Sequence, residues 1–224
     1  MTKELAEVLD RLNKKDFTSE EIQLLNQIYS DTLLYNSALK KLQTQIEILR
    51  DDFRKNNAYN PIEHIKVRIK QPESLMKKMY LKGFPLTVDS IRENVNDIAG
   101  IRIVCTFKSD IYKLASLVEN AQNIEILQIK DYVTNPKESG YKSYHLIVEV
   151  PVFLIKGELR CKVEVQLRTM AMDFWASLEH KIKYKYDFDI PEDIRAELRS
   201  CAKVVDKLDD KMLSLHTIVH NEEN

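Results

Sequence analysis

Hydrophobic and polar residues alternate between residues 162 and 169. Three apolar residues alternate there with Glu164, Gln166 and Arg168, the period-2 pattern of a strand with one apolar and one polar face. Thr169 then has the character of an N-cap, and apolar residues recur at helical spacing up to Ile182. The polar strand face is either a solvated surface or, because it ends at a helix N-terminus, a site for an anion or a metal-bound nucleotide.

The periodicity of the whole chain predicts an α+β protein. Helices are expected over residues 1–17, 18–56, 72–82, 88–94, 109–120 and 169–182, and from residue 191 onwards. The first of them is short and charged, and we expect it to be loosely attached. An extended stretch is expected over 62–70, and strands over 101–107, 125–133, 146–152 and 162–169. Because helices and strands do not alternate regularly, we expect a small, mainly antiparallel sheet flanked by helices.

Apolar residues near both ends of the chain recur at steps of four and three. The first series runs from Tyr35 to Phe53 and the second from Ile194 to Val219. This heptad spacing is typical of helices that pack on other helices, so the terminal helices should pack on each other or on a neighbouring subunit. We therefore divide the chain into N-terminal packing or oligomerisation helices (1–58), a central domain (59–186) and a C-terminal oligomerisation helix (187–224).

Composition narrows the function classes. With 34 basic and 35 acidic residues the formal net charge is −1, which gives no general affinity for nucleic acid or anionic membrane. No segment is long and apolar enough for a membrane span, and the charged N-terminus does not resemble a signal peptide, so a cytoplasmic location is expected. Three distant cysteines indicate reduced thiols. Four scattered glycines exclude the P-loop and the dinucleotide fingerprint.

Candidate chemistry lies around two carboxylates, Asp97 and Glu164, at the edges of the predicted sheet. Carboxylate oxygens suit Mg²⁺, which commonly bridges a protein and substrate phosphates. Cations that could serve phosphoryl chemistry are Arg68, Lys70, Lys77, Lys78, Arg102, Lys137, Lys142 and Arg168. From spacing alone, this set supports only a general nucleotide site.

Four segments together resemble the synthetase domain of the RelA/SpoT family. They are residues 68–74 (RIKQPES), 97–102 (DIAGIR), 137–145 (KESGYKSYH) and 164–181, which begins EVQLRT and continues through FWASLEHK. They occur in the family's order and cover roughly residues 60–186, so the resemblance implies that the central domain (59–186) is the catalytic domain. The short chain is similar to the small alarmone synthetases, and residues 59–64 and 171–174 look closer to the RelP type than to the RelQ type.

The resemblance implies a bacterial enzyme with a nucleotidyltransferase-like fold. Family members transfer pyrophosphate from ATP to the 3′ hydroxyl of GDP or GTP, which yields ppGpp or pppGpp and AMP in the stringent response. It also implies Mg²⁺ as cofactor and a homotetramer. No histidine is followed by the Asp that the family's hydrolase domain requires, so synthesis without hydrolysis is expected.

Positions that match the family's motifs carry expected roles. Asp97 corresponds to the Mg²⁺ ligand, and Glu164 to the carboxylate that assists the metal and acts as general base. The ATP-binding positions are Arg68 and Arg102 on adenine and Lys70, Ser74 and Lys78 on the phosphates. The positions on the GDP or GTP side are Tyr141, which stacks on guanine, and Lys137, Lys142, His145, Gln166 and Arg168.

Asp173 is a further candidate on chemical grounds. A carboxylate in the first turn after the polar strand could accept hydrogen bonds from guanine N1–H and the 2-amino group, a pair that adenine does not offer. Two departures from the family's pattern also matter. Lys142 stands where many relatives have Arg, and Leu81 where some have a basic residue.

Other functions stay open at this level. A related enzyme could pyrophosphorylate adenosine nucleotides or tRNA, and a non-catalytic nucleotide- or RNA-binding module could keep the same fold. Lys181, Lys183 and Lys185 form either a solvated helix end or part of a groove for single-stranded RNA. Retention of both Asp97 and Glu164 favours an enzyme.

Overall fold

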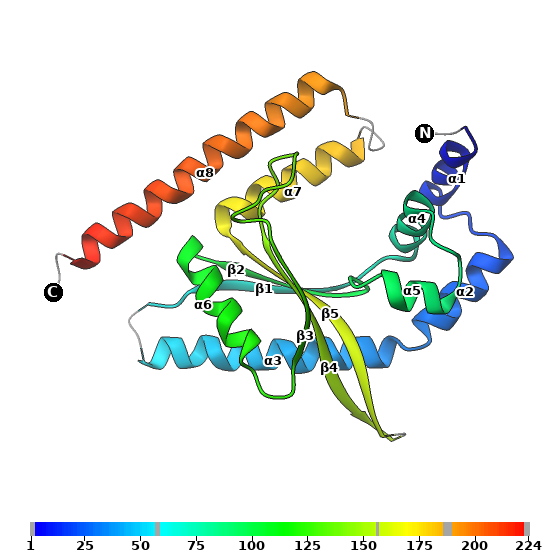
Figure 1. The fold of residues 1–224 in the computed structure, drawn as a ribbon, viewed down its shortest axis with the longest axis horizontal. Coiled ribbons are helices and arrows are strands. Elements are labelled where there is room, and N and C mark those ends of the chain that lie inside the picture. The colour runs from blue at the N-terminus through cyan, green and yellow to red at the C-terminus, as the bar shows by residue number, and fades with distance from the viewer. Residues whose placement is uncertain (1–2, 57–58, 156, 186–189, 222–224) are drawn as a thin grey trace.

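The computed structural model describes residues 3–56, 59–155, 157–185 and 190–221 of the chain (Figure 1). Its strands are β1 (Ile62–Ile69), β2 (Ala99–Cys105), β3 (Glu125–Asp131), β4 (Tyr144–Leu154) and β5 (Gly157–Thr169). Its helices are α1 (Lys3–Asn13), α2 (Ser19–Tyr29), α3 (Thr32–Asn56), α4 (Pro72–Lys82), α5 (Val88–Asn94), α6 (Lys108–Glu119), α7 (Met170–Lys185) and α8 (Glu192–Asn221). None of these helices is long and apolar enough to cross a membrane.

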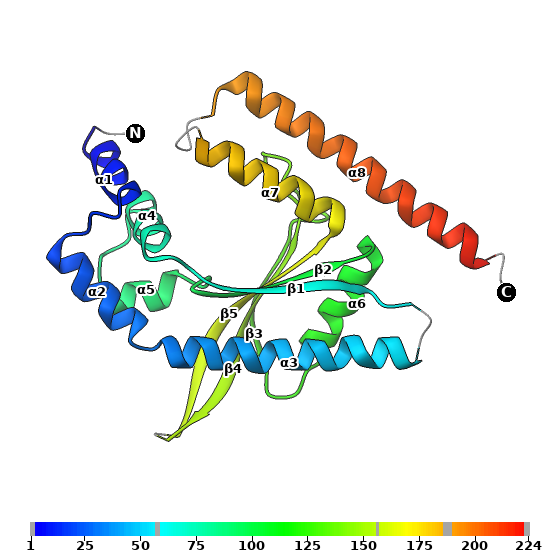
Figure 2. The same cartoon turned by 180° about the vertical axis from the view of Figure 1, so that it is seen from behind.

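The five strands form one sheet in the order β1-β2-β5-β4-β3. Three of the four pairings are antiparallel and β2 with β5 is parallel, so the predicted mainly antiparallel α+β fold is confirmed. The extended stretch predicted over residues 62–70 becomes β1, an edge strand. Because β1 and β5 run in opposite directions, the start of α4 and the start of α7 lie at opposite ends of the sheet (Figure 2).

One face of the sheet is apolar and carries the main core. The alternating residues Val163, Val165 and Leu167 are fully buried there, as the period-2 pattern predicts. Apolar side chains of α3 and α6, among them Leu42 and Leu114, pack on the same face. The opposite face of the sheet therefore displays the polar residues of β1, β2, β4 and β5.

A second core lies beside the sheet, between α1, α2, α4 and α5. Leu12 of α1 is completely buried in it, so the expectation that the first helix is loosely attached is wrong. The single helix predicted over 18–56 is also wrong, because Ser30 and Asp31 separate α2 from α3. The Ser30 and Thr32 hydroxyls donate to backbone carbonyls there, an alternative that competes with helix continuation.

The two heptad-patterned helices do not pack on each other. Leu39, Leu42 and Ile46 of α3 are buried against the sheet, while α8 lies along α7 on the other side of the molecule (Figure 1). Over 20 residues a heptad stripe and the core-facing stripe of a single helix cannot be distinguished. On α8, Leu208 and Leu215 remain about half exposed, so the second alternative, contact with a neighbouring subunit, stays a prediction.

The helices of the second core are joined by a buried carboxylate. Glu21 of α2 is 1% exposed and accepts two hydrogen bonds from the Arg11 guanidinium at 2.7 and 2.8 Å. It also accepts hydrogen bonds from the Tyr80 hydroxyl of α4 and from the Thr18 N–H in a capping box. Burial alone would raise the pKa of Glu21, but these four donors outweigh burial and lower it to about 2.

Glu21→Gln should lower the free energy of unfolding by about 2–3 kcal/mol at pH 7, since charge-assisted hydrogen bonds in a buried site are lost. The folded-state pKa lies below the ordinary value of 4.5, so this stabilisation is present above pH 4.5 and lost as the pH falls towards 2. Urea denaturation of both proteins at several pH values should show the difference narrowing over that interval. The exposed neighbour Glu20→Gln is the control, and a pH-independent difference would contradict the prediction.

Candidate active site

Polar residues cross the open face of the sheet in register. Lys66 of β1 pairs with Arg102 of β2, Arg102 with Gln166 of β5, and Gln166 with His145 of β4. In the next row Gly100 separates Arg68 from Glu164. The sheet thus gathers predicted ATP-side residues on β1 and β2 and predicted acceptor-side residues on β4 and β5, with Glu164 between them.

Two chains of hydrogen bonds connect Arg168 to Glu164. In the first, Arg168 Nη2 donates to Gln166 Oε1 at 3.0 Å, and Gln166 Nε2 donates to Glu164 Oε2 at 2.7 Å. In the second, Arg168 Nη2 contacts the Tyr141 hydroxyl at 2.6 Å, which lies 2.9 Å from His145 Nε2, and His145 Nδ1 lies 3.1 Å from Glu164 Oε1. Both oxygens of Glu164 are therefore engaged.

The donor and acceptor roles in the second chain follow from its ends. A guanidinium can only donate, so the Tyr141 oxygen accepts from Arg168 and its O–H donates to His145 Nε2. The proton of the neutral imidazole then lies on Nδ1, where it donates to Glu164. Burial lowers the pKa of His145, against the opposing effect of Glu164. Burial would raise the pKa of Glu164, but His145 and Gln166 lower it, so Glu164 is held as a carboxylate.

Asp97 lies just before β2 and is paired with two lysines. Lys70 Nζ and Lys78 Nζ each lie 2.8 Å from one of its oxygens. Burial opposes ionisation of Asp97, but the two cations outweigh it and lower the pKa to about 2. Asp97, the predicted metal ligand, is thus brought beside two predicted phosphate contacts, Lys70 and Lys78, which lie 27 and 19 residues away in the sequence. Ser74 is exposed on the first turn of the same helix.

A pocket of about 190 Å³ lies on the β1–β2 side of Glu164, with Arg68 and Arg102 in its wall. Arg102 Nη1 donates to Asp173 Oδ1 at 2.9 Å, and the same oxygen accepts from Arg168 Nη1 at 3.1 Å. Asp173 is therefore placed between the predicted adenine-side and guanine-side arginines. Burial and the charge of Arg168 lower the pKa of Arg102 despite this ion pair.

The loop before β4 presents aromatic and basic groups. The Lys137 ammonium lies 4.7 Å from the ring centre of Tyr132 and 4.8 Å from that of Tyr141, within the range of cation–π contacts. Gly140 adopts φ +89°, and a Cβ there would meet the Cβ of Ala202 at 2.6 Å. Glycine is required because this loop is pressed against α8.

The structure does not bring Lys142 into this group. Its ammonium lies 2.6 Å from Asp206 Oδ1 of α8, so a phosphate contact would require it to leave that partner. The direction of a loop side chain has no signature in the sequence. Lys183 of the basic 181–185 segment is paired with Glu179.

Sequence reasoning missed three residues of the site. Lys66 lines the pocket beside Arg68, His64 Nε2 lies 4.0 Å from Asp173 Oδ2, and Tyr132 contacts Lys137. For the first two a signal existed, because His64 and Lys66 precede Arg68 at period 2 and share its face. Nothing in the local sequence marks Tyr132.

The two carboxylates fit Mg²⁺ in one particular way. Within the described ranges, no group of three or more His, Cys, Asp or Glu side chains is placed to hold a metal ion. Asp97 lies three residues before Gly100, the residue of β2 that pairs with Glu164. Mg²⁺ is commonly bound by one or two carboxylates and completes its shell with water and substrate phosphates. Asp97 and Glu164 therefore fit a metal shared with a substrate.

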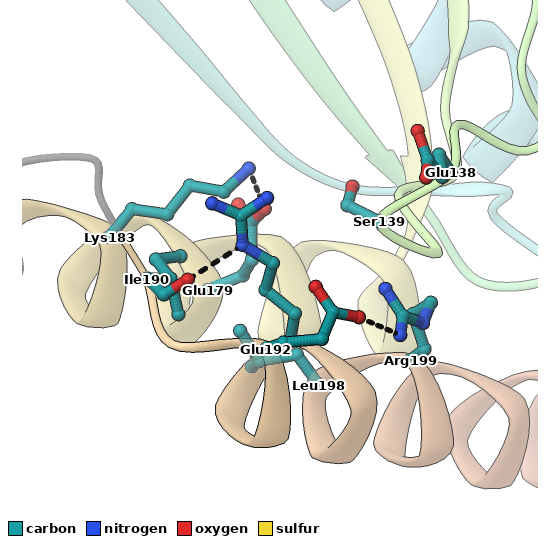
Figure 3. A pocket seen from close by; sticks show the side chains of 9 residues that line it. Glu138, Ser139, Glu179, Lys183, Ile190, Glu192, Leu198 and Arg199 are labelled. Atoms are coloured by element: carbon teal, nitrogen blue, oxygen red, sulfur yellow. Dashed lines mark hydrogen bonds and ion pairs between the residues drawn. The ribbon is translucent and has the colours of Figure 1, made fainter. Parts of the chain in front are cut away.

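A larger pocket of about 350 Å³ lies away from these residues (Figure 3). It opens between the loop at Glu138, the end of α7 and the start of α8. Two ion pairs lie in its wall, Arg199 with Glu192 at 2.6 Å and Lys183 with Glu179. None of the residues predicted for the site lines it.

The part of the chain that carries the site matches a known protein family. Residues 67–189, more than half of the chain, match the family described as "Region found in RelA / SpoT proteins". The chain belongs to the RelA/SpoT family. All candidate residues from Arg68 to Asp173 lie inside the matched region, whereas α1, α2 and α3 lie outside it.

Relatives of this RelA/SpoT family member include two proteins of Bacillus subtilis (strain 168). GTP pyrophosphokinase YwaC is 42% identical over 186 residues, which cover 83% of this chain and 89% of YwaC. GTP pyrophosphokinase YjbM is 35% identical over 178 residues, which cover 80% of this chain and 83% of YjbM. The assignment to the RelP type stays a prediction.

The fold of small alarmone synthetases is confirmed by a solved structure. Small alarmone synthetase 1 from Bacillus subtilis, bound to its product pppGpp, superimposes with a TM-score of 0.81 at 34% identity. The match covers 87% of this chain and 98% of that one. The predicted nucleotidyltransferase-like α+β architecture of the family therefore holds for this chain.

Proposed function

We propose that this chain is a GTP pyrophosphokinase that makes ppGpp or pppGpp from ATP and GDP or GTP, with release of AMP. The observation that carries the proposal is the ionised Glu164, held by His145 and Gln166 between the Arg68–Arg102 pocket and the Tyr141–Lys137 loop. The relatives named as GTP pyrophosphokinases and the similar synthetase bound to pppGpp support it.

ATP would bind on the α4 side. The Arg68 and Arg102 guanidinium planes stack on adenine, which suits their placement on adjacent strands around the pocket. Lys70 and Lys78 then contact the phosphates, with Ser74 at the N-terminus of α4. The ion pairs of both lysines with Asp97 keep these ammonium groups in place before the nucleotide binds.

Chemistry would take place at Glu164. The guanine ring stacks on Tyr141, and Lys137, His145, Gln166 and Arg168 orient the acceptor. Glu164 accepts the proton of the ribose 3′ hydroxyl, whose oxygen attacks the β-phosphorus of ATP. The bond between that phosphorus and the α–β bridging oxygen breaks, and AMP leaves with the electron pair. The hydrogen bonds from His145 and Gln166 fix the carboxylate for this transfer.

We propose Mg²⁺ as the cofactor, with Asp97 and Glu164 as its protein ligands. When bound, it would neutralise charge on the transferring phosphates. The lysines that pair with Asp97 can move onto the nucleotide, so the substrate supplies the negative charge that they lose. The oxygen donors that the two carboxylates offer support this assignment.

We also propose a cytoplasmic homotetramer without hydrolase activity. Apolar residues at helical spacing on α8, among them Val204, Leu208 and Leu215, are 48–64% exposed and offer a face for a neighbouring subunit. Lys142 would contact a phosphate only after exchange of its partner Asp206.

Purified protein with β-labelled ATP, Mg²⁺ and GDP or GTP should yield labelled ppGpp or pppGpp and AMP. Glu164→Gln should lower the rate by about 10²–10⁴-fold, the range for loss of a general base. Glu149→Gln, on the neighbouring strand and paired with Arg160, is the matched control and should retain activity. Transfer to ADP or tRNA instead would indicate a related enzyme with another acceptor, and no turnover at all a binding module.

Asp173→Ala should lower the preference for guanosine over adenosine acceptors by about tenfold or more, because a hydrogen-bonding partner of guanine is lost. The ratio of kcat/KM for GDP and ADP measures this, with Asp210→Ala on α8 as control. In the structure Asp173 Oδ1 already accepts from Arg102 and Arg168. An unchanged acceptor ratio with a raised KM for ATP would show that Asp173 only orients Arg102.

A further inference from the structure

Lys70 lies where the chain leaves the sheet for α4, and its backbone must be held from outside the strand. Its N–H donates to the carbonyl of Ile98, next to Asp97, at 2.7 Å. Its carbonyl cannot be satisfied by the first residue of α4, because Pro72 has no N–H. The Tyr29 hydroxyl at the end of α2 donates to that carbonyl at 2.5 Å.

Tyr29 is built into the second core and is therefore a fixed anchor. Its ring packs against the cluster formed by α1, α2, α4 and α5. Burial raises the pKa of Tyr29, so the hydroxyl keeps the proton that it donates. The same helix is joined to α4 through Glu21 and the Tyr80 hydroxyl at 2.7 Å. α2 is thus hydrogen-bonded to the segment that carries Lys70 and Lys78 at two places, the Lys70 carbonyl and the Tyr80 hydroxyl.

We infer that Tyr29 is a positioning residue for the ATP side of the site, acting through the backbone of Lys70; this rests on the proposed function. The Tyr29 hydroxyl fixes the carbonyl of Lys70, and the Ile98 carbonyl fixes its N–H, so the Lys70 ammonium is directed to Asp97. α1 and α2, which lie outside the matched family region, would then serve nucleotide binding as well as packing.

Loss of the Tyr29 hydroxyl should weaken the binding of ATP but not that of GDP. Without the Tyr29 hydroxyl the Lys70 backbone gains freedom, and part of the binding free energy of the phosphates is spent on fixing it again. Among the described residues, no hydrogen bond or ion pair joins Tyr141 or His145 to α2. The acceptor site should therefore not change. The expected signature is a higher KM for ATP with an unchanged KM for GDP.

Tyr29→Phe tests this, since it keeps the ring and removes only the hydroxyl. The KM for ATP and the dissociation constant of a non-hydrolysable ATP analogue, measured by calorimetry with Mg²⁺ and with EDTA, should rise about three- to tenfold, as expected for one hydrogen bond. The KM for GDP and the melting temperature report on the acceptor site and the fold. Tyr35→Phe, a partly buried tyrosine of α3 that packs on the same cluster, is the matched control.

The outcomes separate this inference from the proposed function. If Tyr29→Phe and Tyr35→Phe bind the analogue equally well and have the same KM for ATP, the role of Tyr29 is overturned, even if the wild type makes ppGpp. Equal increases in the KM for ATP and GDP would also overturn it, because the effect would be general. If the wild type binds the analogue but transfers nothing, the proposed function fails and the calorimetric comparison still decides the role of Tyr29. No analogue binding by the wild type would overturn both.

Discussion

The buried guanidinium of Arg168 is the charge on which the polar face of the sheet depends. Arg168 is only 4% exposed, and a buried charge is costly unless it is paired and hydrogen-bonded. Asp173 supplies the counter-charge and accepts from Nη1, and Gln166 and Tyr141 accept hydrogen bonds from Nη2. Because both acceptors in turn donate towards Glu164, the stabilisation of one cation also orients and ionises the carboxylate at the centre of the site.

The two sides of the site are stabilised differently. On the acceptor side two neutral side chains, His145 and Gln166, hold Glu164 through hydrogen bonds. On the ATP side Asp97 is paired with Lys70 and Lys78, and a polyphosphate can take over the lysines. The second core supports the ATP side, where α2 contacts the backbone of Lys70 and the Tyr80 hydroxyl of α4. On the acceptor side, α8 packs against the loop at Gly140.

Much of the fold and of the polar face of β5 could be predicted from the sequence, because the periodic pattern there is strict. The alternation in β5 placed Glu164, Gln166 and Arg168 on one face, and the N-cap at Thr169 is confirmed by its hydrogen bond from the Met172 N–H. The same rule, applied to β1, would have found His64 and Lys66. The fold class and the family also followed from the sequence.

Other features have no local signal. The apolar stripe of α3 packs on the sheet. The sequence could not distinguish this from packing on another helix, because any core-facing helix has nearly the same spacing. Lys142 turns to Asp206 because α8 returns beside its loop, which depends on tertiary structure. Tyr29 lies 41 residues from the carbonyl that it binds, on a helix outside the family motifs. Such long-range polar contacts appear only once the chain is folded.

The two chains of hydrogen bonds that connect Arg168 to Glu164 are assembled before substrates bind; this is the central claim. ¹⁵N NMR of the histidine side chains in the substrate-free protein at neutral pH tests it most directly, with the His145 signals assigned from the His145→Asn variant. The account predicts a protonated Nδ1 and an unprotonated Nε2 at His145, and loss of this preference in Tyr141→Phe. A proton on Nε2, or a wild-type tautomer mixture that Tyr141→Phe does not change, would contradict it.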